Sequence, residues 1–474
     1  MPKQNLLFII NIETQFSSLL PLASFLRENS VYNPIFFLDF SYHNLHTEQA
    51  FCEKNTFEYV TFSENSIQQA NNLSVLMRLF LVSLTVINFV LFRLFKTRYQ
   101  EFFGHLRNRI QQRINIIDTL KSILNDFQIK VIVFSEASAG YQAPEFVTIA
   151  NKSKIPTLLI PFTVANKLEF AESYLRHLPI YEVKGIAKKT LAFLSPKWVF
   201  KYKDKQLLFF PLLEILAMEI VGLAPKQPWI YNGLDLSKII LDNDFLKEYY
   251  LKEDIDKDKI AVLGTLYMDI CHKKMINKTY YIEEITHFLN FETVKPIVLC
   301  AMPPDFYPNP NYDGYDKMIT EWVKMFNQQD KHNIILSLHP RSTYENFKHF
   351  ENDKIRIFRG NIVEVMPLCD IFVASISATI RMAIACKKIV LNYDVFQWNY
   401  TEYQAVDTVI TVDNSIDFAE KFTLLTSNKV YLDENIEKYQ KYKDFFGKID
   451  GKSGERIITL LDELTHTTNY KNNS

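Results

Sequence analysis

The alternation of short apolar runs with polar segments of helical length constrains the fold of this chain more than any other feature. It is clearest between residues 333 and 395, where apolar runs of four to six residues begin near Asn333, Lys354, Asp370 and Lys388. Such runs are typical of strands that are buried on both faces, and their alternation with helices indicates βαβ units. The sequence therefore predicts an α/β fold with a parallel sheet.

The same alternation opens the chain. Leu6–Asn11 and Pro34–Asp39 have the pattern of buried strands, and Ser17–Glu28 between them has the length of a helix. No G-x-G-x-x-G motif follows the first of these strands, so the sequence predicts no dinucleotide site there. We therefore expect βαβ units in both halves of the chain.

Length places a second limit on the fold, because 474 residues are enough for two domains that each bury a core. We expect the boundary in the Lys- and Asn-rich stretch Lys273–Lys278. The predicted N-terminal domain then covers residues 1–275, the second domain 276–450, and a C-terminal helix and tail 451–474. The five cysteines are scattered and include no C-x-x-C pair, so neither a disulfide framework nor a zinc site is expected.

Polar residues follow two of the predicted strands in the second domain, at the edge of a parallel sheet where ligands bind. Imidazole, guanidinium and hydroxyl groups donate hydrogen bonds, and the free N–H groups of a predicted helix at Ala378–Cys386 add to them. This combination suits a phosphate, although helix capping would explain any one hydroxyl alone. The residues concerned are His339, Pro340 and Arg341 after one strand and Ser375, Ser377 and Thr379 after another.

The order of these motifs resembles the donor-binding domain of GT-B glycosyltransferases. The resemblance is to bacterial transferases of surface polysaccharide (capsule and lipopolysaccharide) that combine a His-Pro motif with a Ser/Ser-Thr motif, such as sialyltransferases and Kdo transferases. Teichoic-acid glycerol-phosphate polymerases share a similar pair. The resemblance implies two Rossmann-like domains that face each other across a cleft. It also implies a nucleotide-sugar donor, linked to CMP or UDP, whose phosphate is neutralised without a metal or other cofactor.

The resemblance assigns residues as well. In such enzymes the loop before the Ser/Thr helix often holds the nucleotide base by backbone contacts, which in this chain means Phe358–Gly360. Gly264–Asp269 is similar to the Gly-x-x-x-x-Asp segment at the hinge of GT-B proteins, including the UDP-N-acetylglucosamine 2-epimerases. His339 is predicted to be catalytic. The predicted donor-binding residues are His339, Pro340, Arg341, Phe358, Arg359, Gly360, Ser375, Ser377 and Thr379.

Glu136 is the predicted catalytic base of the N-terminal domain. It follows the run Lys130–Ser135 and so stands at the carboxyl end of a strand, where a carboxylate can take a proton from an attacking hydroxyl. Sialyltransferases carry an acidic pair followed by glycine at the comparable place, whereas this chain has one acid, with Gly140 four residues later. Capping of the following turn is the alternative role. Thr163, Asn166 and Lys167, beyond the next strand, are predicted to bind the acceptor.

Two segments of the N-terminal domain, 73–113 and 184–225, are predicted to be prone to membrane binding. In the first, fourteen uncharged residues lie between Arg78 and Arg93, fewer than the roughly 20 that a membrane-spanning helix needs. A helix lying in an anionic membrane surface and a buried core helix both fit this pattern. In the second segment, lysines and aromatic residues precede the apolar stretch Leu207–Gly222. Together the segments favour attachment to the inner face of the cell membrane.

The expected partners are therefore a nucleotide-sugar, a glycan or lipid-linked acceptor and the inner-membrane surface. The formal net charge of −1 gives no reason to expect nucleic-acid binding. The N-terminus has no secretory signal, so we expect a cytoplasmic, peripheral location.

The leading functional prediction is metal-independent transfer of a sugar from a nucleotide-activated donor to a surface-polysaccharide or lipid-linked acceptor. A CDP-glycerol-type glycerophosphotransferase would use the same imidazole and hydroxyl groups. A UDP-N-acetylglucosamine 2-epimerase-like enzyme is a further alternative. The phosphate helix of those epimerases carries Gly-Gly and a carboxylate pair, whereas this chain has Ser377-Ala378 and Arg381-Met382. A non-catalytic member of a polysaccharide assembly complex is the fourth.

Overall fold

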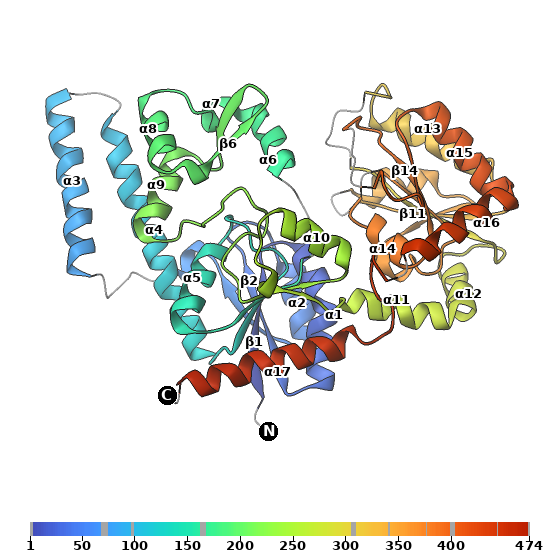
Figure 1. The fold of residues 1–474 in the computed structure, drawn as a ribbon, viewed down its shortest axis with the longest axis horizontal. Helices are drawn as coiled ribbons and strands as arrows, with labels where there is room; N and C mark the ends of the chain where they lie inside the picture. The colour runs from blue at the N-terminus through green and yellow to red at the C-terminus, as the bar shows by residue number, and fades with distance from the viewer. Residues whose placement is uncertain are drawn as a thin grey trace. The chain divides into compact units, whose positions relative to one another are not determined.

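The computed structural model describes residues 3–67, 74–95, 99–161, 167–304, 310–339, 342–375, 377–398, 403–442 and 444–472. The chain forms two compact units (Figure 1). The first unit contains residues 1–240, 250–261 and 458–474, and the second contains 241–249 and 262–457. The boundary that we expected near residue 275 lies inside the second unit.

The first unit is built on a seven-stranded sheet with the order β3-β2-β1-β4-β5-β8-β9. From β3 to β8, neighbouring strands pair in parallel. β1 and β2 consist mostly of buried apolar residues, as strands covered on both faces do. The bounds are β1 Gln4–Ile10, β2 Tyr32–Asp39, β3 Glu58–Phe62, β4 Val131–Phe134, β5 Thr157–Leu159, β8 Lys238–Leu241 and β9 Ile260–Val262.

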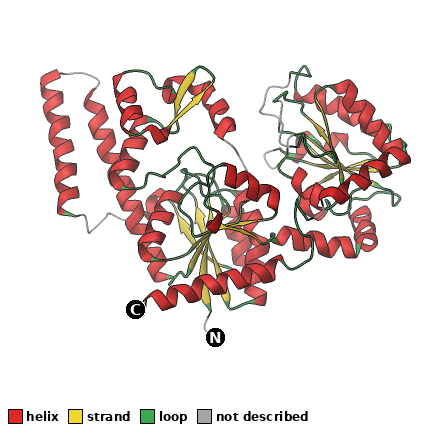
Figure 2. Ribbon diagram, in the orientation of Figure 1, coloured by secondary structure: helices red, strands yellow, loops and turns green. Residues whose placement is uncertain are grey.

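Helices enclose the strands of this sheet (Figure 2). α1 follows β1 and packs on β2, where the Phe16 and Phe36 rings lie with their centroids 4.9 Å apart. α17 also belongs to this unit over most of its length, and its Asp462 accepts a hydrogen bond from the Tyr32 hydroxyl at 2.6 Å. The helices are α1 Glu13–Asn29, α2 His46–Lys54, α4 Tyr99–Asp126, α5 Ala143–Ser153 and α17 Ser453–Asn472, and α10 (Asp244–Lys252) is divided between the units at residues 249–250.

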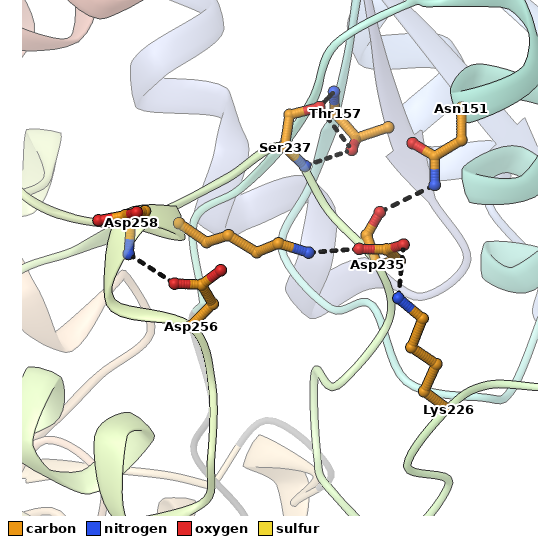
Figure 3. A network of polar contacts seen from close by, with 8 residues as sticks. Asn151, Thr157, Lys226, Asp235, Ser237, Asp256 and Asp258 are labelled. Atoms are coloured by element: carbon orange, nitrogen blue, oxygen red, sulfur yellow. Dashed lines mark hydrogen bonds and ion pairs between the residues drawn. The ribbon is translucent and has the colours of Figure 1, made fainter.

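A polar network fixes the start of β8 beside β5 (Figure 3). The Thr157 and Ser237 side chains each accept a hydrogen bond from the other residue's backbone N–H, at 2.9 and 3.0 Å respectively. Nearby, the Asp235 carboxylate forms ion pairs with Lys259 and Lys226. The hydrogen bond from Lys259 lowers the pKa of Asp235. The network therefore ties the last strands of the sheet to its middle.

Residues 167–221 add a second layer to the first unit. α6, α7, α8, the β6–β7 hairpin and α9 surround a cluster of their own, in which Trp198 is fully buried. The Trp198 indole donates a hydrogen bond to Glu219 at 2.6 Å. The bounds are α6 Lys167–Tyr174, α7 Leu178–Tyr181, α8 Ile186–Leu194, β6 Val199–Tyr202, β7 Lys205–Leu208 and α9 Leu212–Val221.

The stretch 207–222, which the sequence marked as prone to membrane binding, is largely core. Leu207, Leu208, Ile215 and Met218 are fully buried in the Trp198 cluster. The sequence alone could not separate these cases, because a buried helix and a membrane-facing helix are both rich in apolar residues.

α3 (Val75–Phe95) has one buried apolar side and one exposed apolar side. One side packs on α4, where Leu81 and Leu84 are buried against Leu106 and Ile110. The other side is exposed over Val75, Leu76, Leu79, Val82, Val86 and Phe89. Among the described residues, no helix has the length and apolar character needed to cross a membrane.

The second unit has a six-stranded parallel sheet with the order β12-β11-β10-β13-β14-β15. The four apolar runs that the sequence analysis placed near Asn333, Lys354, Asp370 and Lys388 are strands β11, β12, β13 and β14, because both faces of each strand are covered, whereas β15 was not predicted. The strands are β10 Ile297–Ala301, β11 Asn333–Ser337, β12 Ile355–Phe358, β13 Ile371–Ala374, β14 Ile389–Tyr393 and β15 Val409–Val412. The helices are α11 Leu266–Ile276, α12 Lys278–Phe288, α13 Tyr315–Asn327, α14 Ile380–Ala385, α15 Ser415–Ser427 and α16 Lys429–Glu437.

Both sheets follow the same plan. Numbered along its own unit, the first sheet runs 3-2-1-4-5-6-7 and the second runs 3-2-1-4-5-6, so the order reverses between β1 and β4 in the first unit and between β10 and β13 in the second. This is the strand order of Rossmann domains, and it confirms the predicted α/β fold with two Rossmann-like domains. In such sheets ligands bind beyond the carboxyl ends of the strands at the reversal, which is called the switch point.

The Gly264–Asp269 segment joins the start of the second unit to the start of α17. Gly264 has a φ of +80°, and a Cβ there would lie 2.4 Å from the Ser453 Oγ atom, so only glycine fits. The Asp269 carboxylate accepts hydrogen bonds from the backbone N–H groups of Ser453 and Gly454, at 2.9 and 2.8 Å. An acid at this position stabilises the positive end of the helix dipole.

Candidate active site

The predicted donor-binding residues gather at the carboxyl edge of the second sheet. Ser337 at the end of β11 lies opposite Ala301 of β10 and Phe358 of β12, so these three strands end in line. His339 follows β11 by two residues, and Ser375 directly follows β13. Since β10 alone separates β11 from β13, the two segments leave the sheet roughly 10 Å apart. Side chains from both can therefore reach one ligand at the switch point.

Ser375 has the most available of the three predicted hydroxyls. It is only 4% exposed, and within the described part of the chain its Oγ atom has no hydrogen-bond partner. Ser377 and Thr379 instead bond to each other, with 2.7 Å between their hydroxyl oxygens. Buried hydroxyls without a partner are uncommon in folded proteins, so Ser375 suits a bond to a bound molecule.

The helix after these hydroxyls is shorter than the sequence predicted. α14 begins at Ile380 rather than Ala378, because Ala378 and Thr379 form a turn in which the Thr379 N–H donates to Ser377 Oγ at 3.3 Å. Thr379 is the cap residue but makes no side-chain cap bond. With six residues, the helix has a weaker dipole than we expected. Anion binding at this place would therefore depend more on the hydroxyl groups.

The other donor candidates differ in what they can offer. His339 is half-buried, while Pro340 and Arg341 lie outside the described residues. Phe358 is buried, and its ring lies where a Cβ on Gly360 would be, so the loop after β12 can offer its backbone rather than that ring. The Arg359 guanidinium lies 4.6 Å from the centre of the Tyr344 ring, a cation–π contact.

A buried charge pair involves α14, and no sequence motif indicates it. Arg381 on α14 is 6% exposed and interacts electrostatically with Asp242, which directly follows β8. Burial raises the pKa of Asp242, and Arg381 opposes that rise. Asp242-Asn243-Asp244 is an Asp-x-Asp triplet, but its first carboxylate thus faces a cation.

In the first unit, Glu136 stands at the switch point, two residues after the end of β4. Its carboxylate accepts hydrogen bonds from Ser138 Oγ at 3.0 Å and from Gln15 Nε2 at 3.5 Å, and the Tyr231 side chain also bonds to it. Burial raises the pKa of Glu136, while these three bonds oppose the rise. A carboxylate whose pKa is raised by burial in a ligand-binding edge has the character of a general base.

The loop that carries Glu136 is held by another side chain. The Ala137 N–H donates to Asn232 Oδ1 at 2.7 Å, and Asn232 in turn donates to the Tyr250 hydroxyl at 3.1 Å. The turn after Glu136 is therefore capped by Asn232. The hydrogen bonds described for the Glu136 carboxylate come from side chains, not from the backbone N–H groups of the following turn. Glu136 therefore does not cap that turn, which was its alternative role.

The acceptor candidates receive little structural description. Thr163 and Asn166 lie outside the described residues. Lys167 is the first residue of α6, and its ammonium group forms an ion pair with Glu253 at 3.2 Å. Among the described residues, no group of three His, Cys, Asp or Glu side chains is arranged to hold a metal ion.

Comparisons with known proteins bear on the fold. The sequence matches no protein-family model and no functionally curated protein. Solved structures are similar over almost the whole chain. The UDP-GlcNAc 2-epimerase from Methanocaldococcus jannaschii has a TM-score of 0.50 at 16% identity, with 97% of this chain and 100% of that chain covered.

Two further structures are similar in the same way. The UDP-GlcNAc 2-epimerase from Neisseria meningitidis, bound to UDP-GlcNAc, has a TM-score of 0.50 at 15% identity, with 97% and 100% covered. The wall teichoic acid polymerase TagF, determined with CDPG, has a TM-score of 0.52 at 11% identity, with 98% of this chain and 89% of that chain covered. At these identities the likeness shows the fold, which is that of the two Rossmann-like domains of GT-B proteins.

Proposed function

We propose that this chain is a glycosyltransferase that moves a sugar from a nucleotide-activated donor to a glycan or lipid-linked acceptor, without a metal ion. The observation that carries the proposal is the chemistry at the two switch points. One has a buried carboxylate with a raised pKa, Glu136, and the other has the partnerless hydroxyl of Ser375 among further hydroxyls. Transfer to a hydroxyl needs a base for the acceptor and hydrogen-bond donors for the leaving phosphate.

The second unit takes the donor in this proposal. Ser375, Ser377 and Thr379, with His339 and Arg341, donate hydrogen bonds to the phosphate groups, and the backbone of the loop after β12 holds the base. These bonds stabilise the charge that develops on the leaving phosphate, which is the main electrostatic task in this kind of transfer. Glu136 of the first unit removes the proton of the acceptor hydroxyl. The solved structures with UDP-GlcNAc and CDPG support a nucleotide-linked donor on this fold.

A CDP-glycerol-type glycerophosphotransferase is the second candidate. The likeness to the TagF structure favours it, and it would use the same hydroxyls and imidazole. An epimerase is less well supported, because α14 carries the buried Arg381 where the epimerase pattern has a carboxylate pair.

Attachment to a membrane surface completes the proposal. The exposed apolar side of α3 includes Leu76, which is 80% exposed, and α8 presents Ile186 and Phe193 in the same unit, at 87% and 84%. Exposed side chains of this size on two helices suit insertion among lipid headgroups and acyl chains. We assign the inner face of the cell membrane to this surface, where a lipid-linked acceptor would be found.

A nucleotide-binding screen tests the function. CMP, CDP, UDP and GDP are each added to the full-length protein, with and without Mg²⁺, and the melting temperature is measured. A nucleotide at about 100 times its Kd stabilises the folded state by about 3 kcal/mol and raises the melting temperature. We expect one of them to do so without Mg²⁺. CMP or UDP supports a sugar donor, and CDP supports glycerol phosphate.

The matched variants are His339→Ala and His287→Ala. His287 is an exposed residue in the last turn of α12 in the same unit, so its replacement controls for the loss of an imidazole. We expect only His339→Ala to weaken nucleotide binding. If none of the four nucleotides binds to the wild-type protein, with or without Mg²⁺, a non-catalytic member of an assembly complex replaces the transferase.

A further inference from the structure

A polar pocket of about 270 Å³ lies in the first unit, at the carboxyl edge of its sheet. The loops after β2 and before α5 form one wall, and α4 and α9 form the other. No predicted site residue lines it. Its polar lining includes Ser41, Tyr42, Gln112, Arg113, Gln142 and Glu214.

The charges around this pocket are balanced. Arg113 forms ion pairs with Glu145 and Glu214, and the Arg109 Nη1 atom lies 2.5 Å from the other oxygen of Glu214. Two guanidinium groups therefore face two carboxylates. Glu145 is fully buried and pairs with Arg113, and Glu214 pairs with both arginines, so each guanidinium already has a carboxylate partner. A phosphate or carboxylate would have to displace these pairs at a cost in desolvation.

One buried polar atom in the lining lacks a partner among the described residues. Gln142 is 3% exposed, and its Nε2 atom donates to the Tyr42 hydroxyl at 3.3 Å. Its Oε1 atom has no hydrogen-bond partner there, whereas the buried Ser41 hydroxyl interacts with the Asp39 carboxylate. A buried amide oxygen that makes no hydrogen bond costs free energy, so a bound molecule that donates to it is favoured.

An aromatic ring stands beside these groups. Tyr42 is 47% exposed and meets the Tyr141 ring edge-on, with their centroids 5.0 Å apart. The negative face of an aromatic ring attracts the weakly positive C–H groups of a neighbouring molecule. An amide acceptor, a hydroxyl and a ring face, without net charge, together suit a neutral ring that carries several hydroxyl groups.

We propose that this pocket binds one uncharged sugar ring, the terminal residue of the acceptor. Its volume lies just below the roughly 300 Å³ from which ligand pockets usually begin, and therefore suits a single ring. Gln142 lies only six residues beyond Glu136, in the segment that leaves β4. The assignment of this sugar as acceptor rests on the proposed glycosyl transfer, whereas sugar binding does not.

The test measures binding of methyl glycosides of neutral hexoses and N-acetylhexosamines to the full-length protein without nucleotide. Saturation-transfer NMR and isothermal titration report binding, and methyl glucuronide and inorganic phosphate serve as charged comparators. The variants are Gln142→Leu and Ser41→Ala. Gln111→Leu is the matched control, because Gln111 lies on α4 next to Gln112 but bonds to Asn115 outside the pocket.

We expect a neutral glycoside to bind, with a Kd at least about tenfold weaker in Gln142→Leu because its amide acceptor is gone. Ser41→Ala should weaken binding severalfold, and Gln111→Leu should leave it unchanged. Ser41→Ala removes one hydroxyl and keeps the backbone N–H that donates to Asp39, so it decides the test if Gln142→Leu does not fold.

The proposal is overturned if no neutral glycoside binds, if binding survives in the pocket variants, or if phosphate or glucuronide binds better. The nucleotide screen on the second unit separates this failure from failure of the proposed function. If glycosides bind but none of the nucleotides does, the pocket binds sugar and the proposed transferase function is wrong. Nucleotide binding without sugar binding leaves the transferase and removes the pocket.

Discussion

The two sheets share one strand order, yet the residues at their switch points have opposite chemistry. After the fourth strand of the first sheet the chain places a carboxylate, Glu136, whose pKa is raised by burial. After the fourth strand of the second sheet it places Ser375, Ser377 and Thr379, which carry no charge. A carboxylate repels a phosphate and accepts protons, whereas hydroxyls donate to a phosphate. One backbone plan thus provides for two chemical tasks, and the following experiments can break or sharpen this contrast.

The largest effect is expected from Glu136→Gln. The amide cannot accept the proton of the acceptor hydroxyl, so transfer should fall by about 10²- to 10⁴-fold. The nucleotide Kd should stay unchanged, because no donor-binding residue is altered. Turnover and nucleotide titration of the same preparation measure both. Full turnover in this variant would show that Glu136 is not the catalytic base.

The second experiment concerns stability and uses another buried carboxylate at the edge of the first sheet. Asp39 at the end of β2 is fully buried, and burial raises its pKa from 3.8 to about 6. The folded state thus holds this proton more tightly than the unfolded chain, so the free energy of unfolding falls as the pH rises from about 4 to about 6. A shift of about two units corresponds to about 3 kcal/mol.

In Asp39→Asn this loss should be absent. The amide oxygen keeps the bond from the Ser41 N–H, which is 2.9 Å long in the wild type. Urea unfolding at pH 4, 5, 6 and 7 gives the free energy of unfolding of both proteins. The variant should gain on the wild type as the pH rises, by up to about 3 kcal/mol at pH 7. Parallel curves would show that Asp39 does not titrate in this range.

The third experiment compares exposed apolar residues of the two units. Leu76→Gln on α3 should weaken binding to anionic phospholipid vesicles by about 2 kcal/mol, the value of one buried leucine side chain, or about thirtyfold. Ile416→Gln on α15 of the second unit is the control, since Ile416 is similarly exposed at 78%. Vesicle flotation measures both. Equal loss in the two variants, or no binding by the wild type, would contradict a membrane surface on the first unit.

The smallest effect is expected within the hydroxyl cluster. Ser375→Ala should weaken nucleotide binding by about tenfold, because a hydrogen bond to a charged group is lost. Ser377→Ala should cost less, since that hydroxyl already bonds to Thr379. Neither change should alter the melting temperature of the free protein by more than a few degrees. If Ser377→Ala raised the nucleotide Kd more than Ser375→Ala did, the phosphate would be assigned to Ser377 and Thr379 instead of Ser375.

The fold was accessible from the sequence because its signal is local. Buried parallel strands are continuous apolar runs, so β1, β2 and the strands β11 to β14 of the second sheet could be located from their own residues, whereas β15, whose middle residues are not buried, could not. The hydrogen-bond partners of Glu136 could not be identified from the sequence. Gln15 lies 121 residues before it in the chain, and Asn232 bonds to the loop from 95 residues beyond. No short pattern marks such pairs, and the lining of the polar pocket, drawn from two loops and two helices, is hidden for the same reason.

Other features were missed because the signal itself was ambiguous. Apolar residues in 207–222 indicate burial, but the sequence does not say whether protein or lipid covers them. The early turns of α14 were predicted from a helical pattern, yet Ser377 and Thr379 bond to each other and delay the helix to Ile380. Short polar side chains compete with the backbone at such places, and the outcome depends on the surrounding fold.

The chain crosses between the two units four times, which limits how the protein can be divided into separate fragments. It passes from one unit to the other at residues 240–241, 249–250, 261–262 and 457–458. Neither unit is a continuous piece of sequence, and the last crossing leads into α17, whose start is held by Asp269. No single cut yields two complete halves, and neither half can be exchanged for that of another protein as one uninterrupted cassette.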